Sequence, residues 1–218
     1  MTATTPTAPK AKGASRRGLY LSLALGVAVL AGIALDTTVV RVGSETDVRQ
    51  QAFSPDGYGQ QEFPRIREVV QERAIDATEL AQAIAADQEA AIAKYGTPAS
   101  TGAILMVRVT GVAGTPRAGV YPLTVEGIPE GQTIRVQTGP AINGTDLRDA
   151  PGDIAFGAFR NQIEYQDAGS GINRAMAAEV LAPIDTTSLE GRTISVTGAF
   201  RLINPANWMI TPVEMEVQ

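Results

Sequence analysis

The sequence contains no cysteine and no histidine. Without cysteine there can be no disulfide bond, thiol nucleophile or thiolate metal ligand. Without histidine the chain lacks the side chain that most often acts as a general base or a metal ligand near neutral pH. Aromatic residues are also sparse, at 5% of 218 residues. We therefore expect no metal site and no cofactor, and an enzyme built on this chain would have to use carboxylates.

Basic residues are outnumbered over most of the chain. All 23 acidic residues lie from Asp36 onward, whereas Lys10, Lys12, Arg16 and Arg17 precede the first of them. A nucleic-acid-binding protein needs a basic surface to neutralise phosphates. We therefore expect no nucleic-acid partner, and we attribute the acidity to solubility.

One long run lacks charged residues, from Gly18 to Leu35. As a helix it would measure about 27 Å, close to the roughly 30 Å of a bilayer hydrocarbon core. It exceeds the roughly 7–15 apolar residues of a cleaved signal peptide, and the basic residues before it place the N-terminus in the cytoplasm. We predict a single-pass transmembrane signal anchor at residues 18–35 of the bacterial inner membrane, a disordered cytoplasmic tail at 1–17 and a C-terminal domain in the periplasm.

Three other interpretations of this segment compete with an anchor, and one of them, lipidation, is excluded. Small residues around Val29, Leu30 and Ala31 could permit cleavage. The triplet Leu30-Ala31-Gly32 resembles a lipobox, but the next residue is Ile33, so no thiol is present to carry a lipid there. The pair Arg16-Arg17 resembles part of a twin-arginine export signal.

Residues 36–101 are predicted to form a juxtamembrane segment and helices. A short β-prone stretch at 38–42 comes first. Pro64 suits the first position of a helix, and Asp76 followed by Glu79 is typical of an N-cap. The helix after Asp76 should end at Gly96. We expect these helices to pack on the domain that follows.

From residue 102 the hydrophobic period changes to two, which predicts strands. Three strands precede a segment with a helix at 172–181, and two strands follow it; their ranges are 104–112, 119–127, 133–138, 192–202 and 208–217. This order predicts a five-stranded OB-like barrel at 102–218, with Gly111 and Gly198 at sharp bends. The alternative is an open α+β antiparallel sheet. Met106 should point outward, and the last strand should bury Met209, Val213, Met215 and Val217.

Acidic pairs suggest a catalytic alternative. Asp146 with Asp149, or Glu164 with Asp167, could perform acid–base chemistry, and Asp153 could join the first pair around a hard cation. Such spacings are common in solvated loops, and Ser170 between two glycines is interpreted as a turn residue without a base. We expect a non-catalytic protein; the alternative is an envelope enzyme that uses carboxylates, such as a glycan hydrolase.

Neutral polar side chains gather between the third and fifth predicted strands. OB-folds bind ligands on a barrel face between loops, and these side chains could hydrogen-bond or stack on a carbohydrate. The alternative is that they cap turns and that Arg148 pairs with Asp149, Glu164 or Asp167. The predicted ligand- or partner-binding residues are Asn143, Thr145, Arg148, Asn161, Tyr165, Asn173 and Trp208.

The chain also resembles a known family, through several long segments: DTTVVRVGSETDVRQQAFSPDGYG, IRVQTGPAINGTDLRDA, GDIAFGAFRNQIEYQDAG, INRAMAAEVLAP and VTGAFRLINPANWMITPVEMEV. The family is that of predicted periplasmic lipoproteins of unknown function, domain of unknown function 2291, here without the lipobox cysteine. The resemblance implies an envelope protein, encoded beside sugar ABC-transporter components, with no catalytic residues to carry over. We therefore predict a membrane-anchored periplasmic accessory protein whose partners are the inner membrane and either ABC-transporter components or a sugar.

Overall fold

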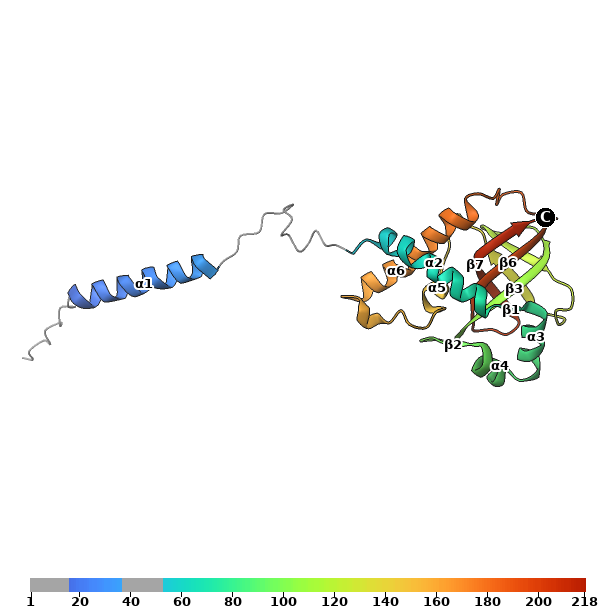
Figure 1. Cartoon of the computed structure of the whole chain (residues 1–218), viewed down its shortest axis with the longest axis horizontal. Coiled ribbons are helices and arrows are strands. Elements are labelled where there is room, and N and C mark those ends of the chain that lie inside the picture. The colour runs from blue at the N-terminus through green and yellow to red at the C-terminus, as the bar shows by residue number, and fades with distance from the viewer. Residues whose placement is uncertain (1–15, 37–52) are drawn as a thin grey trace, which may run out of the picture. The chain divides into compact units, whose positions relative to one another are not determined.

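The computed structural model describes residues 16–36 and 53–218 (Figure 1). The chain divides into two units, Met1–Ala52 and Phe53–Gln218. In the first, the predicted apolar segment is helical, as α1 (Arg16–Asp36). No helix within residues 16–36 and 53–218 is long and apolar enough to cross a membrane. The predicted tail before residue 16 and the β-prone stretch at 38–42 lie outside the described residues.

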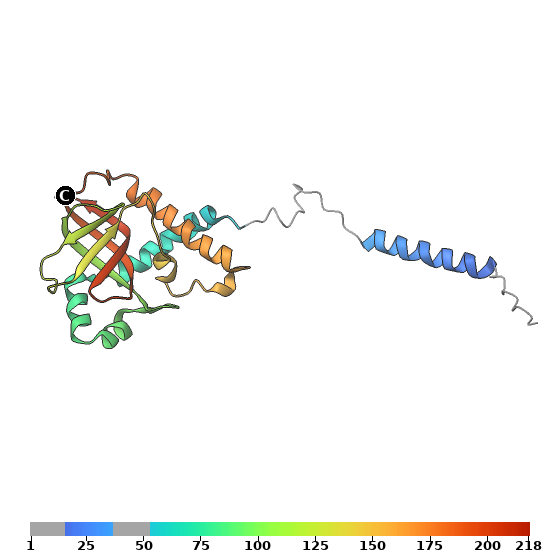
Figure 2. The same cartoon turned by 180° about the vertical axis from the view of Figure 1, so that it is seen from behind.

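The second unit contains a closed five-stranded barrel, seen from behind in Figure 2. Going around it, β3 pairs with β4, β4 with β5, β5 with β7, β7 with β6, and β6 again with β3. Only the β5–β7 pair is parallel. The predicted barrel is confirmed and the open sheet is wrong. The strands are β3 (Ala103–Ala113), β4 (Val120–Thr124), β5 (Thr133–Gln137), β6 (Thr193–Leu202) and β7 (Asn207–Val217).

Glycines sit where the barrel walls come closest. A Cβ on Gly111 would lie 2.7 Å from the carbonyl oxygen of Thr124 on β4, and one on Gly198 would overlap the carbonyl oxygen of Thr211 on β7. The β6–β7 register also shifts between Thr197 and Gly198. These close approaches let a short sheet bend enough to close on itself.

The register shift changes which side chains of β7 face the core. Trp208 and Ile210 are buried, and after the shift Val213 and Met215 are buried instead. The prediction is confirmed for Val213 and Met215, and Val217 is partly buried against the same core. The prediction is wrong for Met209, which is only half-buried, because the bulge reverses the alternation of inward and outward positions.

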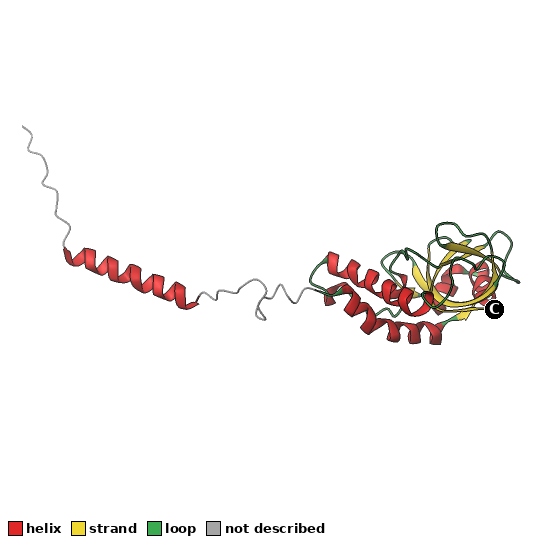
Figure 3. Cartoon of the chain, turned by 90° about the horizontal axis from the view of Figure 1, so that it is seen from above, coloured by secondary structure: helices red, strands yellow, loops and turns green. Residues whose placement is uncertain are grey.

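Helices cover part of the barrel. In chain order they are α2 (Pro55–Arg73), α3 (Ala77–Ala86), α4 (Gln88–Tyr95), α5 (Asp146–Asp149), the 3₁₀ turn η2 (Phe156–Ala158), α6 (Gln162–Met176) and the π turn η3 (Ala177–Leu181). Two short strands, β1 (Ile75–Asp76) and β2 (Thr97–Pro98), pair with β3. Figure 3 shows α2 and α6 side by side next to the ring of strands.

Several helix boundaries differ from the prediction. Helix α2 begins at Pro55, capped by Ser54, so Pro64 lies inside the helix. The helix predicted from Asp76 to Gly96 is broken at Asp87, whose extended backbone ends α3 and whose carboxylate caps α4. Helix α6 starts ten residues before the predicted range and contains Ser170, which is therefore not a turn residue.

A single hydrophobic core joins the helices to the barrel, and its members all come from residues 53–218. Ile104, Leu105 and Met106 are successive residues of β3, yet each is at most 2% exposed. Helices α2, α3 and α4 contact β3, so Met106, predicted to point outward, is buried against them. A core of its own means that this unit can fold without residues 1–52.

Candidate functional site

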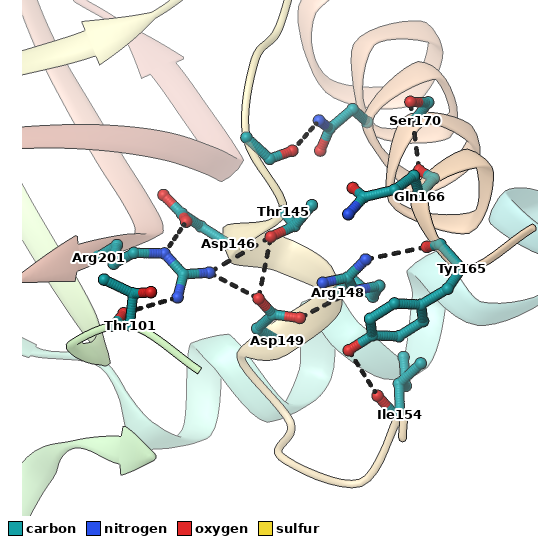
Figure 4. A network of polar contacts seen from close by, with 12 residues as sticks. Thr101, Thr145, Asp146, Arg148, Asp149, Ile154, Tyr165, Gln166, Ser170 and Arg201 are labelled. Atoms are coloured by element: carbon teal, nitrogen blue, oxygen red, sulfur yellow. Dashed lines mark hydrogen bonds and ion pairs between the residues drawn. The ribbon is translucent and has the colours of Figure 1, made fainter. Parts of the chain in front are cut away.

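The structure brings together three of the predicted binding residues, around the short helix α5. Thr145 precedes α5, Arg148 lies in it, and Tyr165 faces them from the first turn of α6 (Figure 4). These three residues therefore lie together in the structure. Their polar groups, however, bind one another and the neighbouring backbone.

Arg148 is the centre of this cluster, and its side chain is only 5% exposed. Its Nε donates to Oδ1 of Asp149 over 2.8 Å, and one terminal nitrogen donates to the carbonyl oxygen of Tyr165 over 2.9 Å. The guanidinium carbon lies 3.6 Å from the ring centroid of Tyr165, which is a cation–π contact. The ion pair with Asp149 is one of the three that the sequence analysis left open.

Arg201, at the end of β6, extends the network to the barrel. It donates to Oδ2 of Asp149 over 2.6 Å and to the carbonyl oxygen of Thr101 over 2.8 Å. Its Nε also lies 3.3 Å from Oδ1 of Asp146. Two arginines and two aspartates thus alternate, with their side chains between 5% and 15% exposed. The network ties α5 and α6 to the barrel wall.

Burial raises the pKa of the Asp146 carboxyl above its ordinary value, although the nearby charge of Arg201 acts in the opposite direction. The carboxylate therefore lies in a poorly solvated position, where the charge of Arg201 stabilises its ionised form.

No motif in the sequence marks Arg201 as part of this site. It lies between the buried Phe200 and Leu202, so the period-two pattern only places it on the outer face of a strand. Its partners lie more than fifty residues earlier, and no local signal links them.

The remaining predicted residues have structural contacts of different kinds. Asn173 is buried and donates to the carbonyl oxygen of Gly144 over 2.9 Å. Asn161 caps α6 by accepting from the backbone N–H of Glu164. Asn143 is exposed, and its backbone exchanges two hydrogen bonds with the side chain of Gln137. Trp208 is fully buried against Phe200, so its ring has no exposed face on which a ligand could stack.

Among the residues that the structure describes, four of the five acidic residues proposed for catalysis or metal binding are paired with arginines, all except Asp167. Asp146 and Asp149 bind Arg201 as described, Glu164 lies 2.7 Å from Arg160, and Asp153 lies 2.8 Å from Arg65. Across residues 16–36 and 53–218, no three acidic side chains are grouped so that they could hold a metal ion.

A hollow of about 480 Å³ lies at one end of the barrel, where β4 begins and β5 ends. Its walls are fixed by hydrogen bonds: the Tyr121 hydroxyl donates to the carbonyl oxygen of Thr186 over 2.9 Å, and the Thr138 hydroxyl donates to that of Gly119 over 3.0 Å. The loop before β6 closes one side. We call this hollow the barrel-end pocket; its lining residues are Pro116, Gly119, Tyr121, Thr138, Gly139, Pro140, Thr186 and Thr187.

The lining of the barrel-end pocket carries no charged side chain. Gly119 permits the closest packing in it, because it has a positive φ of 75° and a Cβ there would overlap the carbonyl oxygen of Gly139. Pro116 and Pro140 offer apolar surface, and Thr186 and Thr187 offer hydroxyl groups, whereas Tyr121 and Thr138 are almost fully buried. This mixture suits a small uncharged molecule. No local sequence pattern predicts this pocket, because its lining comes from three segments that are distant in the chain.

Comparisons with known proteins add two findings. A family model described as "Predicted periplasmic lipoprotein (DUF2291)" matches residues 24–216. Among solved structures, the chain is similar to a crystal structure described as an OB-fold protein from Thermotoga maritima MSB8, with a TM-score of 0.59 and 16% identity over 77% of this chain and 99% of that one. At this identity the likeness shows the fold alone. No curated protein matches the chain.

Proposed function

The chain belongs to the family of predicted periplasmic lipoproteins of unknown function, and from that premise we propose that it is a non-catalytic binding protein of the cell envelope. Membership in this family indicates a periplasmic, membrane-associated location. The proposed activity is the capture of a small uncharged ligand in the barrel-end pocket.

Attachment to the membrane must differ from that of a lipoprotein. The chain contains no cysteine, so no thiol can carry a diacylglycerol group. We assign the attachment to residues 18–35, as a single-pass anchor with the folded unit in the periplasm. No helix within the described residues meets the requirement for crossing a membrane, so the assignment is drawn from the uncharged sequence of residues 18–35 and from the basic residues before it.

The lining of the barrel-end pocket carries the ligand proposal. A pocket of about 480 Å³ is within the usual range for small-molecule sites. With no charged residue in its lining, it would leave a charged ligand without a partner in a partly dehydrated place. A sugar is uncharged and combines C–H faces with hydroxyl groups, so it meets both requirements. Association with ABC-transporter components stays a prediction of the family resemblance.

The ion pairs of Asp146 and Asp149 favour binding over catalysis. A carboxylate-dependent glycan hydrolase needs one carboxyl as a proton donor and another that reaches the substrate or a water. Here Arg201 pairs with both carboxylates, and neither side chain is more than 13% exposed, which leaves little room for a substrate to reach them. The enzymatic alternative would require Arg201 to leave both of them.

The test is a thermal-shift screen of residues 53–218 against neutral sugars, with charged sugars in parallel. A ligand at one hundred times its Kd stabilises the folded state by about 2.7 kcal/mol, which raises Tm. Thr187 is exposed on the pocket rim, so Thr187→Trp should abolish the shift by filling the entrance. Thr133→Trp, on an exposed residue outside the pocket lining, is the matched control and should retain it. A hydrolysis of glycans that Asp149→Asn abolishes would instead establish the enzyme.

A further inference from the structure

Aromatic side chains are rare in this chain, yet five of them meet on one side of the folded unit. The ring centroid of Phe159 lies 5.7 Å from that of Phe53, 5.5 Å from that of Tyr58 and 5.3 Å from that of Tyr165. Phe156 extends the group, 5.6 Å from Tyr165. We call these five residues the aromatic patch: Phe53, Tyr58, Phe156, Phe159 and Tyr165.

The outermost member of the aromatic patch faces solvent. Phe156 is 50% exposed, although it is a large apolar residue. Between Ile154 and Phe159 the sequence is Ala-Phe-Gly-Ala, with no charged residue, and all four residues are exposed. Exposed apolar surface of this kind, backed by a rigid cluster of rings, marks a contact site for an apolar partner.

The position of the patch in the chain identifies the partner. Phe53 is both a patch member and the first residue of the folded unit. Residues 37–52 connect it to the end of α1, and sixteen residues can span at most about 55 Å when fully extended. For a periplasmic, membrane-associated protein anchored through residues 18–35, the patch thus stays within one short linker of the bilayer.

We propose that the aromatic patch docks on the bilayer surface, with Phe156 inserted at the level of the lipid headgroups. Aromatic rings prefer this interface because it accommodates an apolar body beside polar groups. Three acidic residues that lie close to patch members in the sequence carry ion pairs: Asp56 pairs with Arg174 over 2.6 Å, and the ion pairs of Asp153 and Glu164 are given above. An anionic headgroup therefore meets no unpaired carboxylate among those three.

Docking would orient the folded unit. Figures 1 and 2 both show the segment between α5 and α6 on the side where the chain enters the unit, away from the strands. With the aromatic patch on the bilayer, the barrel faces the periplasm. This proposal rests on the proposed anchor at residues 18–35 but not on the barrel-end pocket, so a negative ligand screen would not contradict it.

The test uses the full chain in vesicles of phosphatidylethanolamine and phosphatidylglycerol, with phospholipids brominated near the headgroup as quenchers. Phe156→Trp places a reporter in the patch, and Ile203→Trp places one at a site that is 71% exposed, in the turn between β6 and β7. The native Trp208 is fully buried in the barrel and supplies a constant background. We expect the Phe156→Trp emission to shift to shorter wavelength and to be quenched, and the Ile203→Trp emission to keep the unquenched value.

A second variant tests the contact itself. Adding Gly157→Asp to Phe156→Trp should abolish the quenching, because a carboxylate is expelled from the interface. Thermal unfolding should stay unchanged, because a Cβ at position 157 meets no neighbour within 4 Å. Equal quenching at positions 156 and 203, or none at either, would overturn the proposal. So would a dimer of residues 53–218 in sedimentation experiments that Gly157→Asp dissociates, since the patch would then bind a second copy of the chain.

Discussion

Gly59 of α2 and Gly171 of α6 face each other where the two helices cross. A Cβ on Gly59 would overlap the carbonyl oxygen of Gly171, and a Cβ on Gly171 would overlap that of Pro55. Backbone therefore packs directly on backbone at this crossing, with no side chain between. Helix α2 makes most of its contacts in the folded unit with α6, so these two glycines determine how closely α2 packs on α6.

The first prediction is that Gly171→Ala destabilises the folded unit. The added methyl meets a carbonyl oxygen of the backbone, which cannot rotate away as a flexible side chain can, so the helices must separate. Overpacking of this kind typically lowers the free energy of unfolding by about 1–3 kcal/mol. Urea denaturation of residues 53–218 measures it.

Gly157→Ala is the matched control, because a Cβ there has no neighbour within 4 Å. Its free energy of unfolding should stay within about 0.5 kcal/mol of the unmodified value. If Gly171→Ala were equally neutral, the close helix crossing would be wrong.

Most of the barrel could be predicted from the sequence. The strands have a clear period of two, and a helix between the third and fourth of them is typical of the OB order. The helix boundaries were harder to predict, because the ends of these helices depend on single side chains. Pro64 suits a first helical position, yet Ser54 provides the N-cap ten residues before it, and Asp87 interrupts a stretch of continuous helical periodicity.

The second prediction concerns Arg148. In Arg148→Ala, Asp149 loses one of its two arginine partners while remaining only 11% exposed. Removal of one member of a buried ion pair typically lowers the free energy of unfolding by about 3–5 kcal/mol. Chemical denaturation should show a loss of this order.

Arg174→Ala is the control for this measurement. Its pair with Asp56 is more than half exposed on both sides, so its removal should change the free energy of unfolding by no more than about 1 kcal/mol. An Arg148→Ala protein as stable as Arg174→Ala would mean that the Arg148 network does not hold the fold, and a recognition role for Arg148 would regain support.

The candidate site could be predicted only in part, for a physical reason. Composition correctly singles out polar residues near α5, but it cannot tell whether they face a ligand or one another. That depends on Arg201, which reaches them only after the barrel has closed. The uncharged pocket is likewise a product of closure, since Tyr121, Thr138 and Thr186 meet only when three loops converge.

The third prediction concerns residues 18–35. If this segment is an uncleaved anchor, the intact chain should remain in the membrane fraction through washes with high salt, because apolar burial is not screened by ions. Fractionation followed by mass determination of the N-terminus measures it. A soluble product that begins near Gly32 would show that the segment is a cleaved signal instead.

The fourth prediction concerns the pH dependence of stability. Burial raises the pKa of Asp146 in the folded protein above the ordinary value of 3.8, so between the two values the folded state binds more protons than the unfolded state. Stability contributed at this position therefore falls as pH rises through that window. Asp146→Asn removes the titration of this carboxyl. The unfolding free energy of the unmodified protein, minus that of the variant, should therefore decrease from about pH 3.5 to 7.

Asp185→Asn should show the opposite trend, because hydrogen bonds from Thr187 and Ser188 lower the pKa of Asp185. Urea titrations across this range measure both differences. If the Asp146 difference increased with pH, attraction to Arg201 would outweigh burial at this carboxylate.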